Sequence, residues 1–591
     1  MKKVFAGLVI LLVLSSCLIS CTEQDPQSAI QDSMTDTSNM DFTIPSEDIN
    51  VPSGEGNTTI CFTESGAEVN GNGASAEGHT VTITASGTYE ISGESQSAHI
   101  NVEASNKDKV VLLLAGATLS NLDAPVIYAN TADKVTIQTK AGATSTLTDG
   151  ATRLVDDTKS DGAIFARCDL TLTGEGTLQV TGRYAHAIVT KDDLVITSGT
   201  IEATAKKTAL NGHDSVKIGG GNLILTAGSN GIYADNTEDE SKGYVYISGG
   251  TIALTATTDG IQAQSVLNIE GGTIAITTGK GASSTSTSAK GLKATKDILI
   301  SGGVIHIQSN DDGIHSNNCV VISGGNISIS SGDDGIHADT ALDISAGEIV
   351  IAKSYEGLES SDILIRGGNI SIVASDDGMN AAGGNDGSGL GRPGTGGFFD
   401  VDENASITIS GGYILVDAAG DGIDSNGALT VSGGILLISG PTNSGNGALD
   451  YGSTASITGG VVIATGASGM ATNFTDATNQ GAIMTSFSTV SGGKSIAICN
   501  ASGAVIASFT PNKNYQSVVV SAPEIQKGGT YTIVVGGTVE NTDDNGYVSQ
   551  STLTGGTTLA TITMTSLLYG NGGMGGMPPG GGGGGGRPPR W

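Results

Sequence analysis

The chain is poor in aromatic residues and in positive charge. Only 4% of its 591 residues are Phe, Trp or Tyr, and Trp occurs once. This scarcity argues against a broad aromatic platform for sugars and against the tightly packed core of a globular enzyme. Lys and Arg total 27 against 59 Asp and Glu, which gives a formal net charge of -32. Because such a chain repels a phosphate backbone, we expect no nucleic acid partner.

The chain also lacks an apolar run long enough to cross a membrane. Lys2 and Lys3 precede an apolar stretch from Val4 to Leu14, whereas a spanning helix needs roughly 20 apolar residues. A short apolar stretch between basic residues and small residues is typical of a secretory signal peptide. We therefore expect the protein to be exported.

Two of the six cysteines end this leader, in sequences that resemble the bacterial lipobox: Leu14-Ser15-Ser16-Cys17 and Leu18-Ile19-Ser20-Cys21. Cys21 is the favoured lipidation site, with Cys17 as the alternative, because polar residues follow Cys21 and apolar residues follow Cys17. Lipidation would anchor the protein to a membrane; the alternative is an ordinary signal with incidental cysteines. We thus expect a lipoprotein signal peptide at 1–21, a polar spacer at 22–56, and an extracellular location on the cell surface.

Glycine, by contrast, is abundant, with 90 residues, and it marks a repeat. An acidic residue followed by Gly recurs at Gly313, Gly335, Gly357 and Gly378, in steps of 22, 22 and 21 residues, and a second Asp precedes it in every coil but that of Gly357. A second marker, Ile-Ser-Gly-Gly and its variants, keeps the same period and precedes short alternating strands such as Asn326 to Ile329. A period of about 22 residues is typical of one coil of a β-solenoid. We therefore predict an all-β solenoid.

The repeat also divides the chain. We predict an N-terminal cap with the first coils at 57–160, the main coils at 161–465, a small C-terminal β region at 466–568 and a flexible Gly/Pro-rich tail at 569–591. Caps are expected because a bare terminal coil is an unpaired sheet edge. Insertions interrupt the coils at 236–243, 281–288 and 381–404, and such insertions form loops beside one face, often the binding face.

The four remaining cysteines, Cys61, Cys168, Cys319 and Cys499, have spacings that match neither a zinc site nor a disulfide framework. Cys168 and Cys319 occupy the same position in coils about six apart, which separates them by about 29 Å at roughly 4.8 Å per coil. A disulfide cannot bridge that distance. We predict these two to be small core residues.

Stacked coils turn the acidic pairs into a column of carboxylates, each about one strand spacing from the next. Such a column is costly unless cations neutralise it, and calcium is the hard cation that takes several oxygen ligands. The alternative is that Asp-Gly pairs are ordinary turn formers and the column is a solvated edge. The candidate metal ligands are Asp311, Asp312, Asp333, Asp334, Glu356, Asp376 and Asp377.

A second polar column lies two residues after each corner glycine. Strand alternation places the intervening apolar residue inside and this residue outside, so we expect polar columns along one outer edge. The candidate ligand-binding residues on it are Lys293, His315, His337 and Glu359. Two imidazoles can ligate zinc, but no third nitrogen or thiolate follows in register.

Lys290 and Lys293 lie one coil before Asp312 and His315. In a calcium-dependent eliminase, a Lys or Arg near the ions abstracts the proton α to a uronate carboxylate. The alternative is that these lysines only offset the adjacent carboxylates. The sequence therefore leaves enzymatic activity open, with a binding protein as the favoured interpretation.

The first strands carry Ser86-Gly87-Thr88-Tyr89-Glu90-Ile91-Ser92-Gly93, Val110 to Gly116 and Leu147-Thr148-Asp149-Gly150. Together with the Asp-Gly-Ile-His and Ile-Ser-Gly-Gly coils, these segments resemble a bacterial carbohydrate-binding β-helix family of clostridial-type cell surfaces, over roughly residues 80 to 540. The resemblance implies a right-handed parallel β-helix of pectate-lyase-like shape that binds calcium and cellulose or acidic sugars. By resemblance the calcium ligands are Asp311, Asp312, Asp333, Asp334, Asp376 and Asp377. Tyr355 and Glu356 depart from the pattern in the third coil.

The sequence thus predicts an exported lipoprotein with structural calcium that binds plant-type or acidic polysaccharide along its coils. Calcium could bridge protein carboxylates to uronate carboxylates, which would let so acidic a protein hold an acidic glycan. A calcium-dependent polysaccharide lyase of the pectate type, with Lys290 or Lys293 as base, is one alternative. A non-catalytic surface adhesin is the other.

Overall fold

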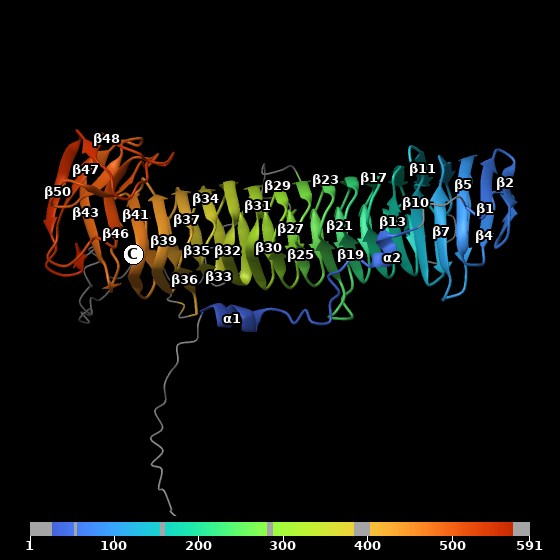
Figure 1. Ribbon diagram of the computed structural model, residues 1–591, viewed down its shortest axis with the longest axis horizontal. Coiled ribbons are helices and arrows are strands. Elements are labelled where there is room, and N and C mark those ends of the chain that lie inside the picture. Colours follow the sequence, from blue (N-terminus) through green and yellow to red (C-terminus); the bar gives the residue numbers. More distant parts are fainter. Residues whose placement is uncertain are drawn as a thin grey trace, which may run out of the picture.

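The structure is a computed structural model that describes residues 26–51, 56–153, 160–279, 288–382, 402 and 404–570. Over these residues the protein is all-β, with one large, mostly parallel sheet whose strands wrap into a long row of coils (Figure 1). The all-β prediction is confirmed. The predicted signal peptide with Cys17 and Cys21, nearly all of the Gly/Pro-rich tail, and most of the insertions at 281–288 and 381–404 lie outside the described residues.

A typical coil contains three strands, which are fused into longer ones in some coils such as that of β32 (Ile336–Ser354), and the strands pair in parallel with their counterparts in the next coil. In one coil these strands are β24 (Ile261–Ala263), β25 (Leu267–Ile269) and β26 (Thr273–Thr278). They pair with β27 (Leu292–Ala294), β28 (Ile298–Ile300) and β29 (Val304–Gln308). The coils therefore stay in register along the axis of the molecule.

The candidate site lies on the face formed by the first strand of each coil, which we call face A. Its strands are β18 (Leu210–Gly212), β21 (Ile232–Ala234), β24, β27, β30 (Ile314–Ser316), the start of β32 (Ile336–Ser354), the start of β33 (Leu358–Ile365), β35 (Met379–Ala381), β38 (Asp424–Ser425) and β40 (Asp450–Tyr451). An acidic or polar corner precedes most of these strands. Face A therefore gathers the two columns that the repeat predicts.

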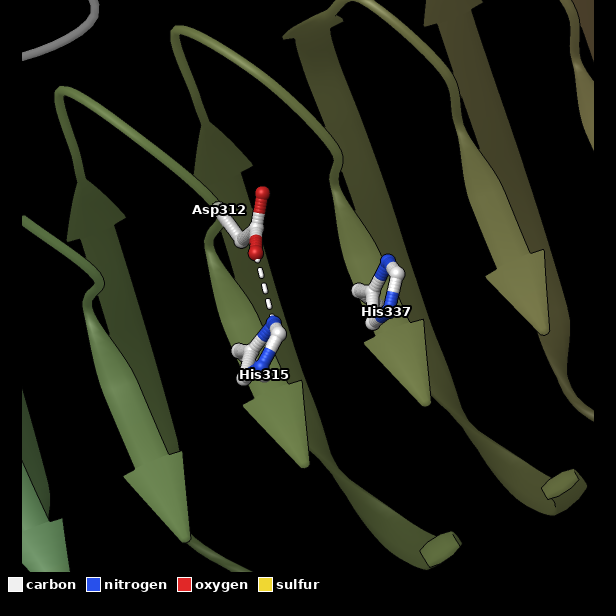
Figure 2. Close-up of side chains that lie close together, drawn as sticks. All are labelled: Asp312, His315 and His337. Atoms are coloured by element: carbon white, nitrogen blue, oxygen red, sulfur yellow. Dashed lines mark hydrogen bonds and ion pairs between the residues drawn. The ribbon is translucent and has the colours of Figure 1, made fainter. Parts of the chain in front are cut away.

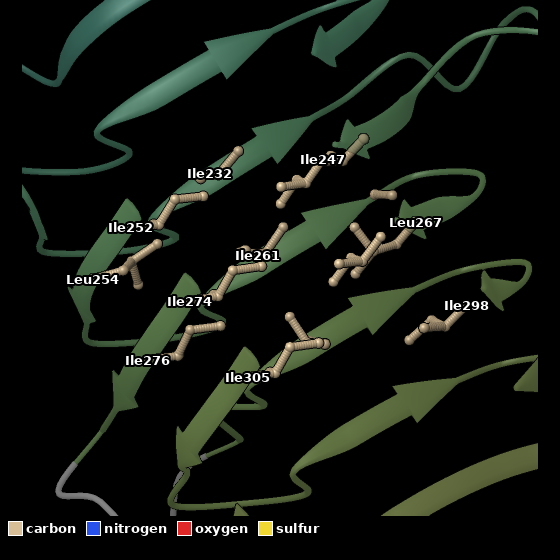
Figure 3. Close-up of a cluster of buried hydrophobic side chains, with 14 of the residues drawn as sticks. Ile232, Ile247, Ile252, Leu254, Ile261, Leu267, Ile274, Ile276, Ile298 and Ile305 are labelled. Carbon is tan, nitrogen blue, oxygen red and sulfur yellow. The ribbon is translucent and has the colours of Figure 1, made fainter. Parts of the chain in front are cut away.

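Columns of apolar side chains fill the interior of the coils (Figure 3). Ile252, Ile274 and Ile305 occupy equivalent positions in successive coils and are at most 1% exposed. They alternate along their strands with exposed residues, as the period-two pattern predicts. Each fully buried Ile contributes about 1.5–3 kcal/mol relative to an exposed one, so the repeat itself supplies the core.

Glycine is required at two kinds of corner. The second glycine of the Gly-Gly marker has a positive φ, as at Gly272 with φ +91°, a conformation that L side chains rarely adopt. The corner Gly313 has no such φ, but a Cβ there would lie 2.4 Å from Ile329 Cγ2 and 2.6 Å from the Gly335 carbonyl oxygen. The close approach of neighbouring coils therefore excludes a side chain at Gly313.

Additional strands cover both ends of the coils. At the N-terminal end, β1 (Thr58–Thr63) pairs antiparallel with β2 (Gly66–Asn70) and parallel with β5 (Gly87–Ser95). At the C-terminal end, β46 (Tyr515–Ala522) pairs antiparallel with β41 (Ala455–Gly466). A separate antiparallel sheet follows, made of β44 (Ile496–Cys499), β45 (Val505–Phe509), β47 (Thr530–Val535) and β50 (Thr557–Thr563). Both ends of the parallel stack are thus paired rather than bare.

Residues 26–50 differ from the polar spacer expected at 22–56, because they lie along the outside of the coils (Figure 1). Helix α1 (Pro26–Ser33) places Ile30 against Cys319 and Leu364. Helix α2 (Ser46–Ile49) places Asp48 3.0 Å from Lys134 Nζ. Scattered apolar residues and one buried ion pair hold the segment, although its overall composition is polar. Among the described residues, neither helix has the length and apolarity needed to cross a membrane.

Cys168 and Cys319 are buried as predicted, but they do not occupy the same position in their coils. Cys168 lies two residues before Leu170 and belongs to the interior of the coils, whereas Cys319 lies one residue before Val320 and packs against Ile30 on the outside. Both are buried, at 5% and 0% exposure, and neither forms a disulfide. The neighbouring Leu170 and Val320 belong to one column, joined by six successive parallel pairings. The two thiols are therefore far apart along the coil axis.

Candidate functional site

The second polar column of face A runs continuously through the coils. Lys293 pairs with His315, His315 with His337, and His337 with Glu359. The same column continues through Asn380 to Asp424. The register therefore places all four candidate ligand-binding residues side by side, in the order that the repeat predicts.

The central members of these columns are buried, whereas strand alternation led us to expect an exposed edge. Asp312 is 2% exposed, His315 4%, His337 0% and Glu359 2%. The rings of His315 and His337 stack with centroids 4.7 Å apart and planes 15° apart, and Asp312 reaches from the corner to His315 (Figure 2). The alternation of residues along a strand shows which side chains point into the core. It does not show that side chains on the other side of the strand are covered by side chains of adjacent coils.

Lys290 neutralises the first acidic corner. Its Nζ lies 2.9 Å from an Asp311 carboxylate oxygen and 2.7 Å from one of Asp312, and the residue is 4% exposed. Burial favours the neutral amine, but the carboxylates of Asp312 and Asp311 outweigh it and raise the pKa of Lys290 above its ordinary value. The neutral form that a base requires is therefore scarce at neutral pH, which favours the charge-offsetting interpretation of Lys290.

Lys293 is more accessible than Lys290. Its side chain is 26% exposed, and its Nζ lies 3.3 Å from an Asp259 carboxylate oxygen. Lys290 and Lys293, the two alternative bases, thus have different environments. Lys290 is enclosed by two carboxylates, whereas Lys293 is partly exposed to solvent.

His315 contacts the first acidic corner, and His337 contacts the following one. His315 Nδ1 lies 2.7 Å from an Asp312 carboxylate oxygen. His337 Nδ1 lies 2.7 Å from Glu359 Oε2 and 3.3 Å from Asp334 Oδ2, and its Nε2 lies 3.0 Å from Asp339 Oδ1. Burial opposes the charged ring, but these carboxylates outweigh burial and raise the pKa of His337. A charged His337 therefore bridges three acidic residues.

The third corner departs from the acidic pair, and its polar groups contact the fourth. Glu356 Oε2 accepts a hydrogen bond of 2.7 Å from Asn380 Nδ2. Burial and the nearby Glu359 raise the pKa of Glu356 to about 8. A hydrogen bond to Asp376, together with burial, raises the pKa of Tyr355. Glu356 is thus a buried carboxyl group. Among the described residues, no Lys, Arg or His forms an ion pair with it.

A further acidic group lies beyond the four predicted corners. Carboxylate oxygens of Asp377, Asp421 and Asp424 lie within 4.8 Å of one another. Burial and the neighbouring carboxylates raise the pKa of Asp377 to about 9, and burial raises the pKa of Asp421 to about 7 and that of Asp424 to about 6. Our site prediction includes Asp377 but neither Asp421 nor Asp424. The signal was the sequence Asp421-Gly422-Ile423-Asp424, which repeats the corner pattern after the insertion at 381–404.

The donor atoms on face A fit a hard cation in some places better than in others. Asp311, Asp312 and Asp333 also bring carboxylate oxygens within 4.8 Å of one another. Calcium at this position would compete with Lys290 for Asp311 and Asp312. Asp377, Asp421 and Asp424 offer an all-oxygen set, which is the chemistry that calcium prefers.

Comparisons with known proteins find a family model that matches part of the chain. Residues 77–335 match the model of a family described as carbohydrate-binding domain-containing protein. A relative of the same description from Acetivibrio thermocellus is 35% identical over 159 residues, which are 26% of this chain and 56% of the relative. The chain therefore spans about half the length of this curated relative.

A solved structure, described as the polysaccharide lyase-like protein from C. thermocellum in a gadolinium derivative, is 33% identical. The similarity covers 41% of this chain and 96% of that chain, with a TM-score of 0.39. The family model that matches residues 77–335 includes the corners at Asp311 and Asp333, and this match confirms the resemblance drawn from the sequence.

Proposed function

We propose that the protein is a polysaccharide-binding protein of the cell surface whose face A holds calcium. The observation that carries this proposal is the family match over residues 77–335, which spans the coils that carry Lys290, Lys293 and His315. The ligand that we propose is cellulose or an acidic plant-type glycan. We also propose the finer fold of a right-handed parallel β-helix, which the parallel pairing of each strand with its counterpart one coil away supports.

Calcium supplies the attraction that the protein lacks on its own. With a formal charge of -32, the chain repels an acidic glycan. A divalent cation held by carboxylates of face A would accept a uronate carboxylate as a further ligand. The proposed metal ligands are those of the sequence prediction: Asp311, Asp312, Asp333, Asp334, Glu356, Asp376 and Asp377.

The members of the second column differ in burial and would therefore have different roles. Lys293 is the accessible cation and would contact the glycan directly. His315, His337 and Glu359 are at most 4% exposed, so they would act by keeping the column neutral and in register. The glycan would thus bind beside Lys293 and the cations rather than on the imidazole rings.

We further propose that a lipid on Cys21 anchors the protein to the membrane. Residues 26–50 pack along the coils through Ile30, Met40 and Asp48. An anchor a few residues before α1 would therefore hold the coils close to the membrane surface rather than at the end of a long spacer. Metabolic labelling with a palmitate analogue tests the anchor, because Cys21→Ser would abolish the label and Cys17→Ser would not.

Affinity electrophoresis with polygalacturonate or soluble cellulose in the gel tests the binding function. The proposal predicts retardation in calcium, loss of retardation in chelator on polygalacturonate, and weaker retardation of Lys293→Ala. Assay of the same mixtures for ultraviolet-absorbing unsaturated uronides tests the lyase alternative. Absence of retardation on every glycan, with and without calcium, would contradict the proposal and favour the adhesin.

A further inference from the structure

A cleft with a volume of about 830 Å³ lies in the C-terminal β region, apart from face A. Its walls come from the turn after β43 (Gly481–Val490), from the segment that joins β47 to β48 (Thr538–Val539), and from the start of β50 (Figure 1). None of these elements carries a strand of face A, and the family match ends at residue 335. The cleft is therefore a candidate site that neither the family match nor the proposed function assigns.

The charge of the cleft differs from that of the chain as a whole. The residues that line the cleft include no Asp or Glu, although the chain contains 59 of them. Lys494 is the one charged residue of the lining, and it is exposed. Its backbone is held in place, because the Tyr515 hydroxyl donates a hydrogen bond of 3.0 Å to its carbonyl oxygen.

The side chain of Lys494 has no carboxylate partner. Lys290 and Lys293 on face A both lie within 3.3 Å of carboxylate oxygens. In the part of the chain that the structure describes, the Lys494 ammonium forms no ion pair. An external anion would therefore meet a cation here without having to displace a carboxylate of the protein.

Hydroxyl side chains make up much of the remaining lining. Six of them form no hydrogen bond through the hydroxyl with any other described residue: Ser491, Ser495, Thr510, Thr538, Thr542 and Thr557. A hydroxyl group both donates and accepts hydrogen bonds, as the hydroxyls of a sugar do. Val490, Val535 and Val539 add apolar contacts, and no aromatic ring lines the cleft. Binding in this cleft would thus depend on hydrogen bonds and on one positive charge.

We propose that this cleft binds a small hydroxylated anion, namely a sugar acid or a sugar phosphate. The Lys494 ammonium would pair with the carboxylate or phosphate, and the hydroxyl side chains would bind the sugar hydroxyls. The cleft volume of about 830 Å³ falls within the range of small-molecule sites, roughly 300–1,000 Å³, and leaves room for about one or two sugar rings. Because the lining contains no carboxylate, the ligand needs no bridging calcium, unlike an acidic glycan on face A. The site does not depend on the proposed function.

Saturation-transfer NMR on the full-length protein in chelator tests the site, with galacturonate, galactose 1-phosphate and neutral galactose as probes. We expect the anions to bind at least several-fold more tightly than galactose, because only they can pair with Lys494. A response to one anion alone would support the site and would identify carboxylate or phosphate as the preferred group. No response to any probe, or equal affinity for galactose and both anions, would overturn the proposal.

Substitutions at two positions locate the binding in the cleft. Lys494→Met should weaken the binding of the anions several-fold and leave that of galactose unchanged. Lys527→Met is the matched control and should change nothing, because this exposed lysine of the same region does not line the cleft. Unchanged affinity of Lys494→Met for both anions would contradict the role of Lys494.

A larger side chain at Thr557 tests the cleft without changing its charge. Thr557→Trp should fill the cleft and abolish the response to all three probes. Thr558→Trp, at the next exposed position of β50, should retain the response because Thr558 does not line the cleft. Equal responses in the two Trp variants would place the ligand elsewhere and overturn the proposal.

Two exchanges separate the cleft from face A. Lys293→Ala should leave the binding of the monosaccharides unchanged, and Lys494→Met should leave the retardation by polygalacturonate in calcium unchanged. If the wild type is still retarded by polygalacturonate in chelator and Lys494→Met is not, the remaining retardation belongs to the cleft. Loss of monosaccharide binding in Lys293→Ala alone would place the ligand on face A and contradict the cleft, while the proposed function would stand.

Discussion

At the residue scale, the decisive contrast is between Lys290 and Lys293, which lie three positions apart in one coil. The Lys290 side chain is 5% exposed and contacts two carboxylates, whereas that of Lys293 is 26% exposed and lies 3.3 Å from one. Breaking a buried pair leaves charge in a medium that solvates it poorly. An exposed pair is screened by solvent. The same residue type is therefore expected to have different roles at the two positions.

Replacing Lys290 by Met should lower the free energy of unfolding by about 3–5 kcal/mol, because Asp311 and Asp312 lose their buried partner. Lys293→Met is the matched control, and it should cost about 0–1 kcal/mol. Urea denaturation in chelator measures both. Equal losses in the two variants would show that the Lys290 pairs are no stronger than a surface pair.

His337 should make stability depend on pH. Its pKa in the folded protein is raised above the usual value of about 6.5. The stability from its charged form is therefore fully present below about pH 6.5 and is lost as pH rises toward the folded pKa. The difference in unfolding free energy between wild type and His337→Gln should thus be largest near pH 6 and smaller at pH 9. A difference that grows with pH would contradict the charged ring.

The sequence predicted which residues share a column, but not how they pair. The step of 22 residues was enough to align Lys293, His315, His337 and Glu359, and the register agrees. Burial could not be predicted, because it depends on Asp312 and Asp334 reaching from the corners to rings on the strands. Asp421 and Asp424 follow the same corner pattern, but the site prediction was confined to the four coils from Asp311 to Asp377 and left them out.

At the scale of elements, the coils follow from the repeat and the N-terminal segment does not. Alternating Ile, Leu and Val residues predict strands such as β26 and β29 directly. Residues 26–50 contain no such period. Their contacts depend on single apolar residues, Ile30 and Met40, that fit between side chains of the coils. A sequence pattern reveals a surface whose apolar residues recur at regular intervals. Residues 26–50 contact the coils through isolated side chains instead, so no such pattern predicts their packing.

The packing of α1 can be tested through the thiol beneath it. Cys319 is 0% exposed and contacts Ile30. Ile30→Asp would place a charge in this apolar contact and detach the helix, so alkylation of Cys319 in the folded protein should become at least several-fold faster. Gln31→Asp, on the exposed side of the same helix, should leave the rate unchanged. Peptide mapping by mass spectrometry separates Cys319 from the exposed Cys61. Equal rates in wild type and Ile30→Asp would show that α1 does not protect the thiol.

At the scale of the whole molecule, the formal charge of the chain is -32, and the carboxylates along face A differ in whether they have a cationic partner. Lys290 and His337 form ion pairs with carboxylates of their own or the next coil, whereas among the described residues Glu356, Asp377, Asp421 and Asp424 form none with Lys, Arg or His. The family match ends at residue 335, before the coils whose carboxylates lack a cationic partner begin. Calcium is therefore expected to stabilise the C-terminal part of the coils most. A cation that binds only the folded chain adds about 2.7 kcal/mol of stability at one hundred times its dissociation constant.

The central claim is that calcium neutralises the carboxylates of face A. The most direct test is the calcium content of the purified protein, together with its thermal midpoint in calcium and in excess chelator. The account predicts bound calcium and a midpoint that falls when the chelator removes it. A protein that contains no calcium and melts at the same temperature in both conditions would contradict it.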